Sequence, residues 1–309
     1  MPIKKFLIVI ISALVLVACK PATNDSKDLK TVENHFSIIT PNGAPALSLI
    51  DFIDNEAFDY EVVEGSDVLV SSFVNADKDF IIAPANLGLN MINKNANYKL
   101  VSVITWGNLY LVGTNEHVNS NKIIAFGEMA VPGKVLSLVN QAFNGAQLEY
   151  YNSVQEVSAA LLADSANFAV LAEPFLTITK NKWNASHENP LYEVYDMQEL
   201  YATEKGVKSY PQAALFVKND LLKKDMNGVI EFANKMASSI TNYNKNSDAL
   251  NARIEQIDLS ALGFADEELI KEAYGRMSLN FVYAYDCVKE LKTFLELFDM
   301  QLSLDSYIK

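Results

Sequence analysis

The sequence predicts an α/β protein built of two βα lobes followed by a helical C-terminal tail. Short apolar runs alternate with longer stretches of helical periodicity from about residue 35 to residue 113. The same alternation restarts at Lys122 and continues to Val217, after which apolar residues recur at helical spacing with almost no Gly or Pro. Because alternating strands and helices favour mostly parallel, helix-covered sheets, each half is expected to form one lobe.

Length and composition are consistent with this class and exclude several others. The chain has 309 residues, 50% of them hydrophobic, enough for one large or two modest domains. Asp and Glu number 38 against 25 Lys and Arg, a formal charge of −13, which argues against nucleic-acid binding. Two cysteines and three histidines leave little for a zinc cage or a disulfide scaffold.

The expected elements of the first half are bounded by turn residues. Short apolar runs such as HFSIIT and DFIIA predict strands, and helical spacing around Leu69 and Phe73 predicts a helix. The expected strands are residues 35–40, 60–63, 79–83, 100–105 and 109–113. The expected helices are residues 45–53, 67–76 and 87–93.

The second half and the tail follow the same rules. Its expected strands are residues 123–126, 148–151, 168–172, 191–195 and 213–217. Its expected helices are residues 132–143, 154–162 and 175–180, followed in the tail by 221–242, 247–257, 266–274 and 286–299. Two lobes and a tail suggest that the chain crosses between the lobes near 112–120 and near 205–213. Lobe one is then expected to comprise residues 34–114 and 212–309, and lobe two residues 115–211.

The first seventeen residues have the pattern of an export signal. Lys4 and Lys5 precede about a dozen apolar residues that end at Val17. A run of this length is too short to cross the roughly 30 Å hydrocarbon core of a bilayer as a stable helix, so the pattern favours a secretory signal.

The residues that follow the apolar run predict lipidation. Leu-Val-Ala-Cys at 16–19 matches the lipobox of bacterial lipoproteins, in which small residues admit the peptidase and the thiol receives a diacylglyceryl group. We therefore expect removal of the signal peptide 1–18, acylation of Cys19 and a polar tether over 19–33. A lipidated Cys19 leaves Cys287 without a disulfide partner. The alternatives are a plain signal peptide and an uncleaved anchor.

Two loop-to-helix junctions are candidate ligand sites. Each lies at the carboxyl end of a lobe's first strand, where open α/β sheets bind ligands, and each places a Gly and then a Pro before a helix: TPNGAPAL at 40–47 and FGEMAVPGKVL at 126–136. Helix N-termini there offer free N–H groups and a partial positive charge. Two facing junctions would form a two-sided clamp; the alternative is a pair of ordinary βα loops.

Several of these segments together resemble one family. The lipobox, PNGAPALSL at 41–49, GEMAVPGKVLSLV at 127–139, AVLAEPF at 169–175 and YGRMSLNFV at 274–282 are similar to segments of the NMT1/THI5-like (SsuA/ThiY-type) substrate-binding lipoproteins of bacterial ABC importers. The resemblance runs over about residues 34–300. It implies a periplasmic-binding-protein-like type II fold with two crossovers, and a monomer without a cofactor that carries palmitate and is held at the outer face of the cell membrane.

The resemblance also implies the function and the residues that perform it. A small-molecule solute is captured between the lobes and delivered to the permease and ATPase subunits of the importer. The implied ligand-binding residues come from both lobes and the hinge: Asn42, Gly43, Ala44, Pro45, Pro84, Ala85, Asn86, Trp106, Gly107, Gly127, Glu128, Met129, Glu173, Arg276 and Asn280.

Three of these residues have alternative roles. Trp106 is expected either to stack on a flat ligand or to pack between the lobes. Glu173 is expected either to point into the cleft or to cap the following helix. Arg276 is expected either to donate to a ligand or to pair with Glu272, four residues earlier on a helix.

The ligand class follows from the scarcity of cations in these segments. Anion capture needs positive charge or many N–H groups, and Asn42-Gly43-Ala44 carries no hydroxyl. We therefore expect a flat neutral or cationic heterocycle, such as a thiamine precursor or another vitamin-like molecule. The alternatives are a small anion such as a sulfonate or nitrate, and a lipoprotein that acts as a sensor or adhesin. The sequence contains no nucleophile-elbow, zinc-protease or P-loop motif, so no enzyme is expected.

Overall fold

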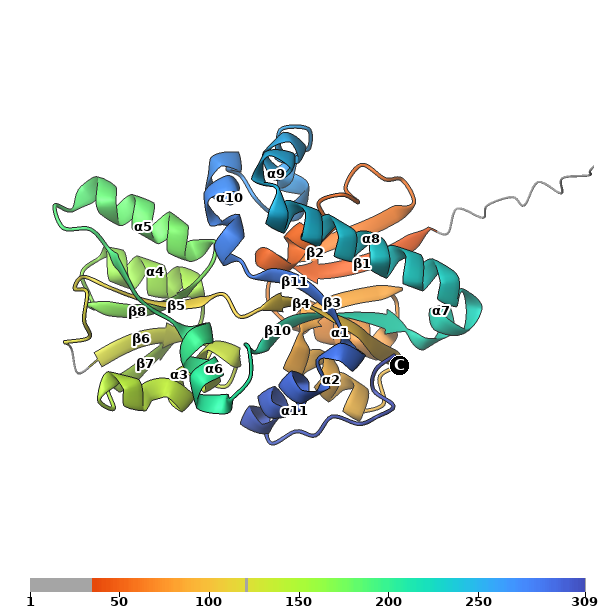
Figure 1. Cartoon of the computed structure of the whole chain (residues 1–309), viewed down its shortest axis with the longest axis horizontal. Coiled ribbons are helices and arrows are strands. Elements are labelled where there is room, and N and C mark those ends of the chain that lie inside the picture. Colours follow the sequence, from red (N-terminus) through yellow and green to blue (C-terminus); the bar gives the residue numbers. More distant parts are fainter. Residues whose placement is uncertain (1–34, 120–121, 309) are drawn as a thin grey trace, which may run out of the picture. The chain divides into compact units, whose positions relative to one another are not determined.

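Two mixed sheets organise the chain (Figure 1). The computed structural model describes residues 35–119 and 122–308. We call the six-stranded sheet and its helices lobe one and the five-stranded sheet and its helices lobe two. The predicted signal peptide, the lipidated Cys19 and the tether at 19–33 lie outside the described residues.

Lobe one has the strand order β11-β4-β10-β3-β1-β2. Its strands are β1 (Phe36–Pro41), β2 (Phe58–Val63), β3 (Phe80–Pro84), β4 (Tyr98–Trp106), β10 (Pro211–Lys218) and β11 (Leu279–Tyr283). Its helices are the 3-10 helix η1 (Ala44–Leu49), α1 (Asp67–Asn75), α2 (Ala85–Asn93), α7 (Asn219–Lys224), α8 (Met226–Lys245), α9 (Ser247–Ile254), η3 (Leu259–Leu262), α10 (Glu267–Ala273), η4 (Tyr274–Arg276), η5 (Ala284–Asp286), α11 (Val288–Leu295) and η6 (Glu296–Phe298).

Lobe two has the strand order β7-β6-β8-β5-β9. Its strands are β5 (Leu109–Gly113), β6 (Lys122–Phe126), β7 (Gln147–Tyr151), β8 (Phe168–Ala172) and β9 (Tyr192–Asp196). Its helices are α3 (Val131–Val139), the 3-10 helix η2 (Asn140–Phe143), α4 (Val154–Leu162), α5 (Phe175–Ser186) and α6 (Met197–Lys205).

The chain first crosses between the sheets at Trp106–Leu109, earlier than the sequence predicts. The strand β5 belongs to lobe two, where it pairs antiparallel with β8 and β9. The expected end of lobe one at residue 114 is therefore wrong. The second crossover lies between the end of α6 at Lys205 and the start of β10 at Pro211. Each crossover inserts an antiparallel strand, so the sheets are mixed and less parallel than predicted.

Four elements differ in kind or number from the sequence prediction. The single helix expected over 221–242 is two helices, α7 and α8, separated at Asp225. The helix expected over 45–53 is a short 3-10 helix that ends at Leu49. The helix α6 was not predicted, and β11 interrupts a tail that was predicted to be entirely helical. The strand β11 extends lobe one by pairing antiparallel with β4, which places the tail segment after α10 against the sheet.

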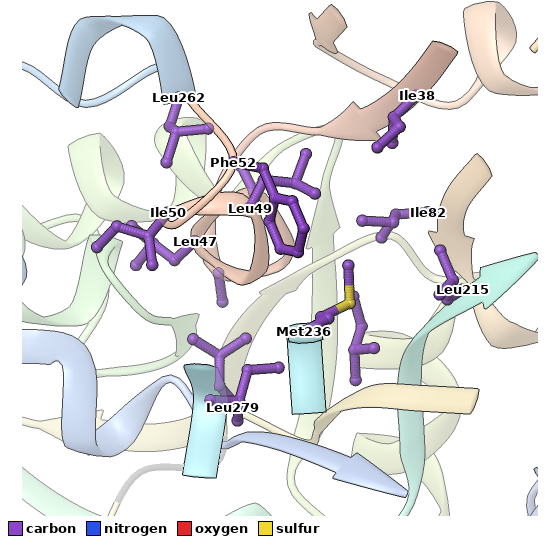
Figure 2. Close-up of a cluster of buried hydrophobic side chains, with 14 of the residues drawn as sticks. Ile38, Leu47, Leu49, Ile50, Phe52, Ile82, Leu215, Met236, Leu262 and Leu279 are labelled. Atoms are coloured by element: carbon purple, nitrogen blue, oxygen red, sulfur yellow. The ribbon is translucent and has the colours of Figure 1, made fainter. Parts of the chain in front are cut away.

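Apolar residues alternate between the two faces of the lobe-one sheet. Ile38 faces η1 and α8, whereas Ile39 faces α1 and α2. Figure 2 shows the first of these faces, where Ile38, Ile82 and Leu215 of three neighbouring strands lie close to residues of η1 and to Met236.

The core of the second face continues into lobe two. Tyr201 of α6 packs against Tyr210 of the second crossover with ring centroids 5.1 Å apart, and Tyr210 stacks on Phe294 of α11 at 6.2 Å. All three side chains are fully buried. The crossovers are therefore backed by a continuous apolar layer that joins the two lobes.

Candidate functional site

A cavity of about 340 Å³ lies between the lobes at the carboxyl ends of their parallel strands. Both lobes, Asn108 of the first crossover and the start of β10 contribute to its walls, as expected for a ligand site in sheets of this kind. Its lining residues are Pro41, Asn42, Gly43, Ala44, Pro45, Pro84, Asn108, Phe126, Ser153, Val154, Gln155, Ala172, Glu173, Pro174, Phe175, Gln212 and Ala213. We call this cavity the cleft.

The lobe-one wall follows from the junction between β1 and η1. The backbone of Gly43 has a φ of 91°, a conformation that L side chains rarely adopt, and no atom lies within 4 Å of the place where a Cβ would stand. Pro45 lies in the first turn of η1, where its missing N–H leaves no helix bond unmade. This turn directs Asn42 and Gly43 to the cleft.

Glu173 is the charged side chain of the cleft lining. It follows β8, and only 3% of the residue is exposed. Its carboxylate accepts hydrogen bonds from the Thr177 N–H at 3.2 Å and from the Thr177 hydroxyl at 2.9 and 3.0 Å. Glu173 therefore caps α5, which is one of the two roles considered from the sequence. The residue borders the cleft, but its carboxylate is turned to Thr177 and has no exposed surface.

Arg276 reaches across from lobe one to this carboxylate. Its Nε donates to Glu173 Oε1 at 2.6 Å and its Nη2 to the Thr177 hydroxyl at 2.6 Å. The carbonyl of Arg276 accepts a hydrogen bond from the Tyr110 hydroxyl of β5 at 3.0 Å. The sequence alternative, a pair with Glu272, is not formed, because the Glu272 carboxylate instead binds Asn181 of α5 at 3.0 Å.

Burial and ion pairing act in opposite directions on the pKa of Glu173. Burial raises the pKa of Glu173 above the usual range for a glutamate, and the Arg276 guanidinium and the Thr177 hydrogen bonds oppose that rise. The charged form of Glu173 is therefore stable only while Arg276 pairs with it. Without Arg276, the buried carboxylate would have lost its hydration and gained no opposite charge in return.

The remaining polar groups of the cleft are neutral. The side-chain amide of Asn108 donates to the Glu173 carbonyl at 3.4 Å, which leaves its Oδ1 without a partner in the part of the chain that is described. Gln212 Oε1 is likewise buried and without a partner. Both oxygens lie below the accessible surface, so a donor on a bound molecule would reach them only if these side chains moved. Such a donor would remove a cost of about 1–3 kcal/mol for each oxygen.

Six of the sequence-predicted site residues line the cleft. They belong to the end of β1, the end of β3 and the turn after β8: Asn42, Gly43, Ala44, Pro45, Pro84 and Glu173. Arg276 is next to the cleft and bound to Glu173. Ala85 and Asn86 begin α2 and are not part of the lining, because Ala85 is fully buried in the core.

Trp106 and Asn280 line a different hollow, of about 200 Å³, together with Lys208, Ser209 and Cys287 among others. The indole N–H of Trp106 donates to the Asn280 carbonyl at 2.8 Å, which ties β4 to β11. Stacking of Trp106 on a molecule in the cleft is therefore not supported.

Three further predicted residues lie outside the lining. Gly107 is buried against Gln198, with a φ of 82° that allows the sharp first crossover. Glu128 and Met129 are exposed, and Met129 is 72% exposed. The loop folds back over the first turn of α3, so that a Cβ on Gly133 would lie 2.3 Å from the Glu128 carbonyl. Gly127 precedes this loop and also lies outside the lining.

Sequence reasoning missed most of the lobe-two wall. The pattern Ser-Val-Gln-Glu at 153–156 is a capping box at the carboxyl end of β7 and was a usable signal. Phe126 and Phe175 are terminal residues of segments that were singled out, but the sequence does not show which side of the backbone faces the cleft. Asn108 and Gln212 line it because the first crossover and the first residues of β10 lie next to it.

No protein-family model matches this chain, and no curated protein matches its sequence. Solved structures do resemble it. An ABC transporter from Parabacteroides distasonis aligns with a TM-score of 0.75 at 20% identity, covering 89% of this chain and 99% of that one. The ligand-binding component of an ABC-type import system from Staphylococcus aureus, with zinc bound, aligns at 0.67 and 12% identity, covering 89% and 96%.

The periplasmic aliphatic sulphonate binding protein SsuA from Escherichia coli aligns with a TM-score of 0.64 at 10% identity, covering 89% of this chain and 92% of that one. The sequence resemblance to SsuA-type proteins is therefore matched by the structural neighbours, and the predicted two-lobed periplasmic-binding-protein-like fold is confirmed. Within residues 35–119 and 122–308, no helix is long and apolar enough to cross a membrane. Over the same residues, no three His, Cys, Asp or Glu side chains are grouped to hold a metal ion.

Proposed function

We propose that this protein is an extracytoplasmic solute-binding lipoprotein of an ABC importer, anchored through Cys19, that works as a monomer and delivers its solute to a permease and ATPase. The observation that supports it best is the 340 Å³ cleft, which is walled by both lobes and lies beside the first crossover and the start of β10. A cavity so placed changes shape whenever the lobes move about the crossovers, which is how a two-lobed protein captures a small molecule. The structural neighbours named as ABC transport components are consistent with this role.

The lining favours a small, flat, heterocyclic solute such as a vitamin or a vitamin precursor. Phe126, Phe175 and four prolines supply apolar and aromatic contact area, and Asn42, Gln155 and Gln212 supply amide donors and acceptors. A few placed polar groups on mostly apolar walls are typical of sites that bind small organic molecules.

A matched pair of tryptophan variants tests this function. We expect native mass spectrometry of the protein from residue 20 onward, purified without denaturation, to show one small molecule per chain. In Gln155→Trp the new side chain replaces an exposed residue of the cleft lining and fills the cavity, so this adduct should be lost. Gln141→Trp, at an exposed position of η2 away from the cleft, should retain it.

Two results would contradict the proposal. The first is the same adduct at the same occupancy in Gln155→Trp and in the wild-type protein. The second is a wild-type protein with no small-molecule adduct that instead binds another protein in a complex unaffected by Gln155→Trp. That second result would favour a sensor or adhesin lipoprotein.

A further inference from the structure

We propose that Glu173 is a built-in counter-ion: its carboxylate occupies the position at which the cleft would otherwise bind an anion, so the cleft accepts an uncharged solute. This inference rests on the proposed solute-binding function and narrows its ligand class. It assigns to Glu173 a role in specificity through exclusion, where the sequence suggested direct contact with a cationic ligand.

The groups around Glu173 form an anion-binding set. A backbone N–H at the start of α5, a hydroxyl on its first turn and the Arg276 guanidinium converge on one carboxylate, at distances of 2.6 to 3.2 Å. Helix N-termini and arginine side chains are the groups that bind sulfonate, nitrate and carboxylate ligands. Here the bound anion is a side chain of the protein itself, and Thr177 on the α5 side is fully buried.

The N-terminus of α4, the other lobe-two helix that begins at the cleft, is also occupied by side chains of its own first turn. Ser153 Oγ accepts a hydrogen bond from the Glu156 N–H at 3.2 Å, and Glu156 Oε2 accepts one from the Asn152 N–H at 3.0 Å. This capping box places a carboxylate at the N-terminus of α4, where it offsets the partial positive charge of the helix end. The two lobe-two helix ends at the cleft, those of α4 and α5, therefore already hold a glutamate.

The rest of the cleft lining offers no positive charge in place of the groups that these glutamates already bind. Within the described chain, the lining contains no Lys, Arg, His or Asp. An anion would enter next to Glu173 with no free cation to pair with it, and a cation would meet a carboxylate whose oxygens are already bound. Because moving an ion out of water without a partner is costly, both kinds of ion are disfavoured relative to a neutral molecule.

A charge-removing variant tests this directly. Glu173→Ala removes the carboxylate and the volume that it fills, and so leaves Arg276 without its partner beside an open position. We expect isothermal titration calorimetry with sodium methanesulfonate and sodium nitrate, at constant ionic strength, to show no binding to the wild-type protein at 10 mM. The variant should bind at least one of these anions at least tenfold more tightly than that limit. In the matched control Glu173→Ala/Arg276→Met, which opens the same position but lacks both charges, the gain should disappear.

The outcomes separate this inference from the proposed function. Tight methanesulfonate or nitrate binding by the wild-type protein would overturn the inference and leave solute binding intact. A folded Glu173→Ala variant that gains no anion affinity would also overturn it. The wild-type protein gives a test that needs no variant: the solute released from the native complex should be uncharged at pH 7, and a sulfonate, nitrate or carboxylate would overturn the inference. Absence of any solute would instead count against the proposed function.

Discussion

Arg276→Met is expected to lower the free energy of unfolding by about 3 kcal/mol at pH 8, because it leaves Glu173 as an unpaired charge in a buried position. The side chain of Glu173 has no exposed surface, whereas that of Arg276 is 31% exposed. The loss therefore comes from the carboxylate that stays behind more than from the guanidinium that is removed. Urea unfolding of the variant and the wild-type protein at pH 5 and pH 8 measures it.

The sign of the pH dependence follows from the proton on Glu173. Burial already raises the pKa of Glu173, and removal of its cation raises it further. Above about pH 4.3, the ordinary glutamate value, the native variant then holds a proton that the unfolded chain has lost. The variant is thus expected to lose stability relative to the wild type as pH rises from about 4.3 through the raised pKa, and to recover it as pH falls.

Glu173→Gln/Arg276→Met is the control for this pH dependence. It has no charge at either position, so its stability relative to the wild type should vary much less between pH 5 and pH 8 than that of Arg276→Met. An Arg276→Met variant that loses the same free energy at both pH values would contradict the account, because its Glu173 would then be solvated in the native state.

Gly107→Ala is expected to lower the free energy of unfolding by about 3 kcal/mol or more and to displace both crossovers. The φ of 82° at Gly107 disfavours any residue with a Cβ, by about 1–2 kcal/mol. The added Cβ would also lie 2.0 Å from Gln198 Cγ, an overlap that adds about 1–3 kcal/mol. Gln198 Oε1 accepts hydrogen bonds from the Leu109 N–H at 2.9 Å and the Tyr210 hydroxyl at 3.1 Å, so its displacement loosens both crossovers.

Gly206→Ala is the matched control for Gly107→Ala. Gly206 also has a positive φ, of 65°, but no atom lies within 4 Å of its Cβ position. Urea unfolding of this variant is therefore expected to show a free energy of unfolding lower by only about 1–2 kcal/mol, which comes from the positive φ alone. Equal losses in the two variants would show that the contact with Gln198 does not hold the crossovers in place.

Local sequence patterns predicted the elements of both lobes better than their assignment to a sheet. The run Leu109–Gly113 is apolar on both faces because β5 lies inside its sheet, between β8 and β9. The same run would suit an inner strand of lobe one equally well, so the sequence does not show where the chain crosses. The strand β11 was missed because Leu279–Tyr283 is short and follows a helical stretch, and it forms through pairing with β4.

In the candidate site, too, local features were predicted from the sequence and long-range contacts were not. Residues at strand ends, such as Asn42, Gly43 and Glu173, were found because the position of a strand end is a local property. The partner of Arg276 was missed because it lies 103 positions away in the sequence, in the other lobe. Trp106 was selected as a rare aromatic residue at a hinge, but its hydrogen bond to Asn280 holds it at another hollow.

Distance measurements between spin labels on the two lobes test the central claim most directly. Glu64, exposed after β2, and Met129, exposed after β6, lie at the carboxyl ends of strands in different lobes. Labels at Glu64→Cys and Met129→Cys, in protein that begins after Cys19, report on lobe movement. Burial raises the pKa of the Cys287 thiol to about 12, so that buried group should stay unlabelled.

The labelled protein is first unfolded and refolded to remove its solute, and double electron–electron resonance is recorded. The measurement is then repeated after the solute released from native protein is added back. We expect a shorter and narrower distance distribution in the second measurement, because the bound solute holds the lobes closed. Identical distributions with the solute demonstrably bound would contradict capture by lobe closure.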